Sequence, residues 1–474
     1  MIVDNPKLIK DMRERIIDDP VDFDSETTIA RHLIGSLAES TKMLGISNTK
    51  LLSADGFLWV YSMKTGTWSR LEVDDIVTLV QLYDGTSTNE NKPKRVRIGY
   101  QKSVNIAKST HRLHNILGAD FFASPRPGIP CANGFLTVSA RGVEVTPHDP
   151  DNRATVGYDI DVGADENEDP PLKWLEFLHS LWAGDEDDKY EKINVLQEFC
   201  GAAIAGLSTE YQRCLLLLGY GSNGKSLLCE FIAELMFPEG TATFISPRRW
   251  ASDYSMAAMK DSRINLVSEL PENEAMEPAI FKAVIAGDRL EARLPYQPPH
   301  FIRPSAGHIF SANEIPHTSD TSHGFFRRFI TMKFERNFED DPDRKTKTEI
   351  MGPLMEERGA IIMWALIGAS RLIRRGEYPT VASHSDTVQN WKKSSCAVID
   401  FVDSCLDVGV GATPLADLMA EFQEWAPTVG RSPRMKARTL SDRLVKSGMI
   451  KKRMGSGMVF PCSIRTTQNR QVAT

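Results

Sequence analysis

A glycine-rich segment followed by a lysine and a serine constrains the fold of this chain more than any other feature. Residues 219–226 read Gly-Tyr-Gly-Ser-Asn-Gly-Lys-Ser and fit the pattern G-x-x-x-x-G-K-[ST] in full. The preceding residues 214–218 form an apolar run typical of a buried strand, and residues 226–236 carry apolar side chains at helical spacing. Strands and helices continue to alternate over residues 211–335, which predicts an α/β fold built on a parallel sheet.

The residue types of this loop suit the binding of nucleotide phosphates. Glycines permit backbone angles that let successive N–H groups converge on phosphate oxygens, and the following helix N-terminus adds partial positive charge. Lys225 is expected to bridge the β- and γ-phosphates, and the Ser226 hydroxyl is expected to ligate Mg²⁺. We therefore predict ATP and Mg²⁺ as the cofactors. The residues expected to contact the nucleotide are Gly219, Gly221, Ser222, Asn223, Gly224, Lys225, Ser226 and Leu227.

Two later strand-like segments end in polar residues that can complete a hydrolytic site. Residues 264–269 form a short apolar run ending in Glu269, and residues 308–313 form another ending in Asn313. A nucleotide-hydrolysing enzyme of this kind needs an acid on a neighbouring strand, which holds Mg²⁺ and polarises the attacking water. We predict Glu269 for that role, with Ser226 as the other metal ligand, and expect the Asn313 amide to contact the γ-phosphate or the water. Taken alone, each residue is also common at the end of a strand.

A pair of arginines precedes the next strand-like run. Arg327 and Arg328 come directly before residues 329–334. Arginine stabilises the charge spread over a transferring phosphoryl group, and in ring ATPases a neighbouring subunit donates it. An isolated pair is usually a surface feature. Because the pair follows the loop, Glu269 and Asn313 in order along the chain, it predicts a catalytic arginine. That arginine is either Arg327 or Arg328.

Composition and charge limit the remaining possibilities. The chain has 474 residues, 41% hydrophobic and 25% charged, which is typical of a soluble protein of about three domains. The net charge is −7, yet residues 426–470 hold eleven Lys and Arg against one acid, indicating a DNA-binding module or a solvated basic tail. The longest apolar run, residues 360–369, is half of what a bilayer needs, and the N-terminus has no signal-peptide core. The seven cysteines are scattered, so we expect reduced thiols in a cytoplasmic protein without membrane contact.

Sequence patterns divide the chain into five segments. Residues 1–158 are expected to form a strand-rich N-terminal α+β domain, with hairpins signalled near Gly66, Gly134 and Gly142. The remaining segments are an acidic linker and helical collar (159–208), an ATPase core (209–338), a helical lid (339–383) and a basic module of short helices with a terminal hairpin (384–474).

The order of these elements resembles the superfamily 3 helicases, and within them the phage and plasmid primase–helicase family. The resemblance covers roughly residues 50–460. Many members carry paired acids at the second strand, whereas here Ser268 precedes Glu269. The segments that carry the resemblance are 219–226, Ser268-Glu269, 281–288, Phe301 with Arg303-Pro304, Ser311-Ala312-Asn313 with Ile315-Pro316, Arg327-Arg328 and, upstream, Asn133-Gly134-Phe135-Leu136 and Thr146-Pro147-His148.

The resemblance implies an AAA+-like P-loop ATPase core, a hexameric ring of identical subunits and 3′-to-5′ movement on single-stranded DNA. This activity would serve replication of a phage, plasmid or other mobile element. The resemblance also implies a β-hairpin over residues 290–303 that projects into the ring channel. Its bases, Arg293, His300 and Arg303, would contact DNA through the phosphates.

The resemblance further implies a C-terminal winged-helix module over residues 400–464 that binds duplex DNA. A helix over residues 437–447 would enter the major groove, and the wing hairpin over residues 449–460 would lie on the backbone. The expected contacts are Arg438, Arg443, Lys446, Lys451, Lys452 and Arg453. One D-x-D of the region before the core, Asp159-Ile160-Asp161, lies in the acidic linker, and any primase is expected to be a separate protein.

Two other functions fit part of the pattern. One is an origin-binding ATPase that acts as a switch or loader and translocates little, and the other is a small-molecule P-loop kinase. The arginine pair and the expected channel hairpin favour the helicase over the switch. The basic C-terminal segment argues against the kinase. ATP hydrolysis measured with and without single-stranded DNA separates the three.

Overall fold

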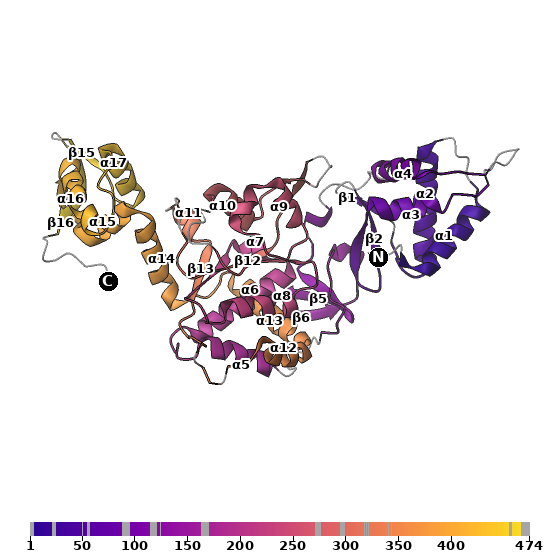
Figure 1. The fold of residues 1–474 in the computed structure, drawn as a ribbon, viewed down its shortest axis with the longest axis horizontal. Helices are drawn as coiled ribbons and strands as arrows, with labels where there is room; N and C mark the ends of the chain where they lie inside the picture. The colour runs from indigo at the N-terminus through magenta and orange to yellow at the C-terminus, as the bar shows by residue number, and fades with distance from the viewer. Residues whose placement is uncertain are drawn as a thin grey trace.

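A five-stranded parallel sheet lies at the centre of the molecule (Figure 1). The chain is seen here in a computed structural model that describes residues 4–20, 25–49, 51–54, 57–87, 95–113, 121–123, 125–162, 170–270, 276–293, 299–316, 318, 320, 322–339, 341, 342, 344–454 and 457–465. The strand order is β13-β7-β12-β9-β8, and every paired strand runs parallel to its neighbour. The strands are β7 (Cys214–Leu218), β8 (Ala242–Thr243), β9 (Ile264–Val267), β12 (Gly307–Ala312) and β13 (Phe329–Lys333). The predicted α/β fold with a parallel sheet is therefore confirmed.

Helices cover both faces of this sheet, which explains why its strands are apolar throughout. Successive side chains of a strand point to opposite faces, so Leu215 and Leu217 of β7 enter one hydrophobic core while Leu216 enters another. The first core is shared with α6 (Lys189–Ala205), α8 (Lys225–Met236) and α13 (Arg358–Arg375), and the second with α10 (Pro278–Ala286), α11 (His323–Phe326) and α14 (Ala382–Ser395). The other helices of this central body are α5 (Leu172–Leu181), α7 (Ser208–Tyr211), α9 (Asp253–Ala258) and α12 (Lys347–Glu356).

The N-terminal region contributes two small antiparallel sheets that pack differently. The strands β1 (Leu52–Ala54), β2 (Phe57–Ser62) and β3 (Thr67–Leu71) lie beside α1 (Pro6–Asp18), α2 (Glu26–Met43), α3 (Val73–Gln81) and α4 (Tyr100–Leu113). The strands β4 (Gly128–Cys131), β5 (Gly134–Ser139) and β6 (Gly142–Thr146) pack against α13 instead and share the first sheet core. The hairpins predicted at Gly66, Gly134 and Gly142 are thus confirmed.

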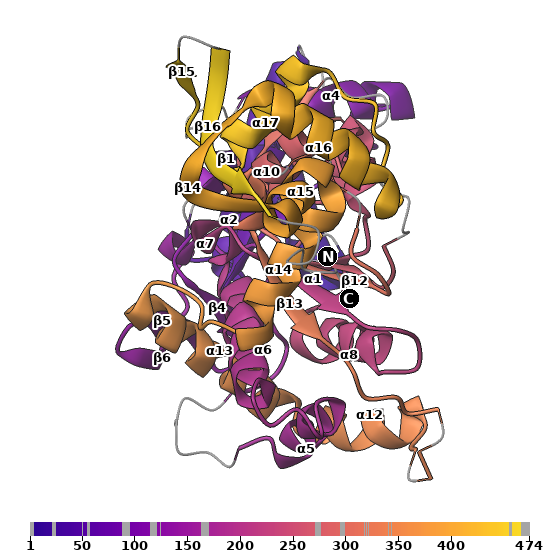
Figure 2. The ribbon, with the colours of Figure 1, turned by 90° about the vertical axis from the view of Figure 1, so that its left-hand side faces the viewer.

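The C-terminal residues form a unit with its own hydrophobic core, set apart from the central sheet in Figure 1 and nearest the viewer in Figure 2. It consists of α15 (Ala397–Cys405), α16 (Leu415–Thr428), α17 (Ala437–Lys446) and an antiparallel sheet of β14 (Leu406–Pro414), β16 (Gly457–Ile464) and β15 (Lys452–Met454). The predicted short helices and terminal hairpin are present. Helix α14, which precedes this unit, packs with the sheet core, because Trp391 is fully buried there and its indole N–H donates to Pro316 O at 2.7 Å.

Within the described ranges, no helix is both long enough and apolar enough to span a membrane.

Candidate active site

The glycine-rich loop, residues 219–224, joins the end of β7 to the start of α8, as the sequence predicts. Gly224 is the N-cap of α8 and adopts a left-handed φ of 84°, which glycine tolerates best. A Cβ there would also lie 2.6 Å from Leu181 Cδ2. At the other end of the loop, a Cβ on Gly219 would lie 2.2 Å from Phe334 O. Gly224 is therefore favoured by its left-handed backbone, and Gly219 by the close approach of the Phe334 carbonyl in the segment after β13.

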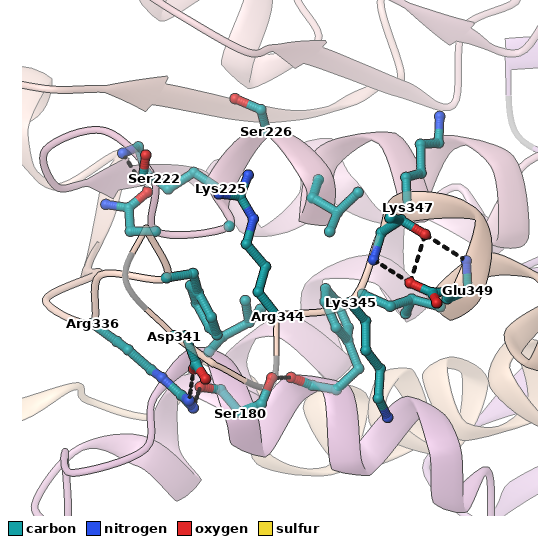
Figure 3. A pocket seen from close by; sticks show the side chains of 18 of the residues that line it. Ser180, Ser222, Lys225, Ser226, Arg336, Asp341, Arg344, Lys345, Lys347 and Glu349 are labelled. Carbon is teal, nitrogen blue, oxygen red and sulfur yellow. Dashed lines mark hydrogen bonds and ion pairs between the residues drawn. The ribbon is translucent and has the colours of Figure 1, made fainter.

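A cavity of about 1210 Å³ opens beside this loop (Figure 3). One wall is the loop with the start of α8, and the opposite wall is α5 with side chains that follow β13, from Arg336, Phe338 and Asp341 to Pro353 and Leu354. The ends of β9 and β12 also reach it. The cavity brings together most of the predicted site residues, namely Gly221, Ser222, Asn223, Gly224, Lys225, Ser226, Leu227, Glu269 and Asn313, whereas Gly219 does not line it.

Glu269 and Asn313 lie side by side at the edge of the sheet. Asn313 Nδ2 donates to Glu269 Oε1 at 3.4 Å, and both side chains are exposed. The backbone fixes this proximity, because Leu270 N, just beyond β9, donates to Ser311 O near the end of β12 at 2.7 Å. The sequence predicts the acid on the strand next to β7. Instead β12 pairs with both β7 and β9, so the strand that delivers Asn313 lies between the loop and Glu269.

Lys225 is held inside the loop that precedes it. Its side chain is only 5% exposed, and the ammonium donates to Gly219 O, Tyr220 O and Asn223 Oδ1. Burial lowers the pKa of Lys225 from its ordinary value, and the negative charge of Glu269 partly offsets that shift. The lysine thus faces a loop of converging acceptors within electrostatic reach of the predicted acid.

The segment after β13 adds basic side chains that the sequence reasoning did not assign to the site. Arg344 and Lys345 line the cavity and are exposed, and Arg344 extends from the far wall toward the loop (Figure 3). Arg336 is committed elsewhere, since it donates to Ser180 O at 2.7 Å and pairs with Asp341. Lys347 pairs with Glu230 and Glu234, each at 2.9 Å. The run Arg344-Lys345-Thr346-Lys347 was the available signal, but sequence gives no reason to place it opposite the loop.

The arginine pair lies at the other end of the sheet. Arg328 O accepts from the backbone N–H of Cys214, the first residue of β7, whereas the loop follows the last. At about 3.3 Å per residue, the five residue steps from Cys214 to Gly219 put the backbone of the pair roughly 17 Å from the start of the loop. Arg327 is exposed and donates to Gln212 Oε1 at 3.2 Å. Arg328 is only 8% exposed, and its guanidinium donates to Gly324 O. Neither lines the cavity of its own chain.

The predicted DNA contacts lie apart from the cavity. Strands β10 (Leu290–Ala292) and β11 (His300–Ile302) pair antiparallel, as expected for the hairpin, and Arg293 and Arg303 beside them are exposed. Its tip, residues 294–298, and the side chain of His300 lie outside the described residues. The predicted C-terminal contacts are all exposed, with Arg438, Arg443 and Lys446 on α17 and Lys451, Lys452 and Arg453 at β15.

Comparison with known proteins adds a local family match and distant structural similarity. A family model described as a family of unknown function, DUF5906, matches residues 217–328, from the end of β7 to the arginine pair. No curated protein matches the chain. The apo structure of the NrS-1 C-terminal region is similar with a TM-score of 0.47 and 10% identity, over 94% of this chain and 100% of that one. The A form apo structure of that region gives a TM-score of 0.43 and 12% identity, over 63% of this chain and 76% of that one. Assignment of the site therefore rests on its own residues.

Proposed function

We propose that this chain is an ATP-dependent DNA helicase that works as a hexameric ring and translocates 3′-to-5′ on single-stranded DNA during replication of a phage, plasmid or other mobile element. The observation that carries the proposal is the convergence of Lys225, Ser226, Glu269 and Asn313 on one cavity. They come from the ends of three parallel strands, where ligands of open α/β sheets commonly bind.

The shape and lining of the cavity suit ATP. Its loop wall offers the α8 N-terminus and the Lys225 ammonium to phosphates. The lining also has an apolar part, which suits a heterocyclic base. It is made by Phe177, Leu181, Ile350, Pro353 and Leu354. The volume of about 1210 Å³ is at least as large as a typical small-molecule pocket of about 300–1,000 Å³, so a nucleoside triphosphate has room.

The donor set near the phosphates suits Mg²⁺. Ser226 supplies a hydroxyl oxygen and Glu269 a carboxylate, both exposed in the same cavity, and Mg²⁺ prefers oxygen ligands. The bound ion would neutralise charge on the β- and γ-phosphates. The chain's own residues do the rest. Lys225 holds the phosphate charge, Glu269 orients and polarises the attacking water, and Asn313 keeps that carboxylate in place through the hydrogen bond between them.

The place of the arginine pair supports the proposal that a second subunit completes the site. Because the pair lies at the sheet end opposite the loop, it does not reach its own cavity, but it can face the cavity of an adjacent subunit. Of the two, Arg327 is exposed and so is available for that contact, whereas Arg328 is buried and bonded within its own chain. In this proposal hydrolysis depends on ring assembly.

Two basic surfaces are available to DNA. The hairpin of β10 and β11 carries Arg293 and Arg303 at its base and would follow single-stranded DNA through phosphate contacts. The exposed bases of α17 and β15 would bind duplex DNA. A separate primase would supply primers.

The deciding experiment measures ATP hydrolysis and strand separation together. We expect single-stranded DNA to raise the ATPase rate, and a duplex with a 3′ single-stranded tail to be unwound. ATP-dependent assembly on duplex DNA without strand separation would instead support the origin-bound switch. Absence of ATP binding would overturn the proposal altogether.

A further inference from the structure

Asn223 is hydrogen-bonded at both ends of its side-chain amide. Its oxygen accepts from Lys225 Nζ at 2.9 Å, and its nitrogen donates to Phe334 O at 3.2 Å. The side chain is 4% exposed, so both bonds are shielded from water. The amide therefore joins the lysine to a segment outside the loop.

The Phe334 end of this amide is a fixed point. Phe334 follows β13 directly, and its own N–H donates to Leu218 O at 2.7 Å. Its carbonyl also lies so near Gly219 that a Cβ on the glycine would approach it to 2.2 Å. The edge strand of the sheet therefore anchors Asn223, and Asn223 in turn fixes an acceptor for Lys225.

The hydrogen bond between Asn223 and Lys225 explains the role of this contact with Phe334. An ammonium has three protons, and the loop offers it three acceptors: Gly219 O, Asn223 Oδ1 and Tyr220 O. The Tyr220 contact is the longest at 3.5 Å and so is the weakest. When phosphate oxygens approach, that contact is the first to be exchanged. The bond to Asn223 can remain and aim the freed donor into the cavity.

We propose that Asn223 is a positioning residue that acts through Lys225. Its hydrogen bonds link the Lys225 ammonium to the segment after β13 and thereby direct the positive charge of the lysine at the phosphates. This inference rests on the proposed ATPase function. It differs from the simple expectation that Asn223 itself contacts the nucleotide, because its two amide ends are already bonded within the chain.

A double-mutant cycle on nucleotide affinity tests this dependence. The dissociation constant of a fluorescent ATP analogue with Mg²⁺ is measured for the full chain and for Asn223→Ala, Lys225→Met and the double variant. We expect Asn223→Ala to weaken binding about tenfold when Lys225 is present and less than about twofold in the Lys225→Met background, because interacting residues are non-additive. Equal losses in both backgrounds would overturn the proposal, since a residue that only shapes the loop or binds the nucleotide directly acts without the lysine.

Asn265 provides a matched control. It is a fully buried asparagine whose amide accepts from Ile245 N at 2.9 Å and donates to Ile245 O at 3.0 Å, so these bonds tie it to the segment after β8 instead of to the lysine. Asn265→Ala should lower thermal stability and change affinity by the same factor whether or not Lys225→Met is also present. If Asn265→Ala shows the same coupling to the lysine as Asn223→Ala, the coupling reflects a general loss of stability, and the proposed role of Asn223 is wrong.

Further outcomes distinguish a folding defect from a loss of function, and failure of this inference from failure of the proposed function. If Asn223→Ala unfolds, Asn223→Ser gives the same cycle with a smaller loss of volume, and its prediction is unchanged. If the unsubstituted chain does not bind the analogue, both the proposed function and the proposed role of Asn223 are overturned. If the unsubstituted chain binds and hydrolyses ATP but the cycle is additive, only the proposed positioning role of Asn223 is overturned.

Discussion

Asn313 Nδ2 donates a hydrogen bond to Glu269 Oε1 over 3.4 Å, and this contact joins the two polar residues that end adjacent strands. An amide N–H donates to a carboxylate without transferring its proton, so the contact orients Glu269 and leaves its charge available. Glu269 can therefore serve as the acid that orients the attacking water, which leads to the first prediction.

Substitution Glu269→Gln should slow hydrolysis while leaving ATP binding in place. The amide keeps the shape of the side chain but loses the charge that polarises water, so we expect a loss in kcat of roughly a hundredfold or more. Steady-state ATPase and nucleotide binding measured on the same protein check this. Glu314→Gln is the matched control, because Glu314 is a nearby exposed carboxylate that does not line the cavity. Normal turnover by Glu269→Gln would mean that another acid serves the site.

Substitution Lys225→Ala should abolish hydrolysis and leave the fold intact. The ammonium is the loop's own cation, and removing a charge that stabilises the transition state costs at least about a hundredfold in rate. Turnover is measured alongside circular dichroism and thermal unfolding. Wild-type turnover in a folded Lys225→Ala protein is the result that contradicts the assignment of the loop.

The two neighbouring arginines should give different losses. Arg327→Ala removes an exposed guanidinium, so we expect ATPase to fall by about a thousandfold with little change in stability. Arg328→Ala removes a buried group that donates to Gly324 O, so it should cost roughly 1–3 kcal/mol in the free energy of unfolding. Thermal and chemical denaturation separate the two effects.

Complementation tests whether Arg327 acts on a neighbouring subunit. Lys225→Ala protein has an intact arginine, and Arg327→Ala protein has an intact loop. Each should be nearly inactive alone. Mixed rings should recover part of the ATPase activity, because some subunit interfaces then combine an intact loop with an intact arginine. If mixed rings form, as seen by analytical ultracentrifugation, and stay inactive, Arg327 does not act in trans.

Removal of the C-terminal unit should weaken duplex binding and flatten its salt dependence. The deletion is best made over residues 396–474, because α14 before it is packed into the sheet core through Trp391. Each lost phosphate contact lowers the log–log salt slope by about 0.9, so replacing Lys451, Lys452 and Arg453 by Gln should lower it by up to about 3. DNA-independent ATPase should survive both changes. An unchanged slope would place the duplex-binding surface elsewhere.

Local sequence was enough to determine several features of this protein. The buried strand Cys214–Leu218, the glycines of the loop and the helix behind them follow from residue types that are neighbours in the chain. The same holds for Glu269 and Asn313 at strand ends, and for the hairpins at Gly134 and Gly142. Backbone preferences and apolar periodicity act over a few residues, so a single chain reveals them.

Tertiary structure alone decided which residues that are distant in the sequence lie close together. Sequence gives Arg327 and Arg328 equal standing, and only packing leaves the first exposed and buries the second. Nor does sequence place β12 between β7 and β9, Arg344 across from the loop, or Trp391 against Pro316. These relationships join residues far apart in the chain. They are fixed by strand pairing and by close packing of the two cores, which depend on the whole fold at once.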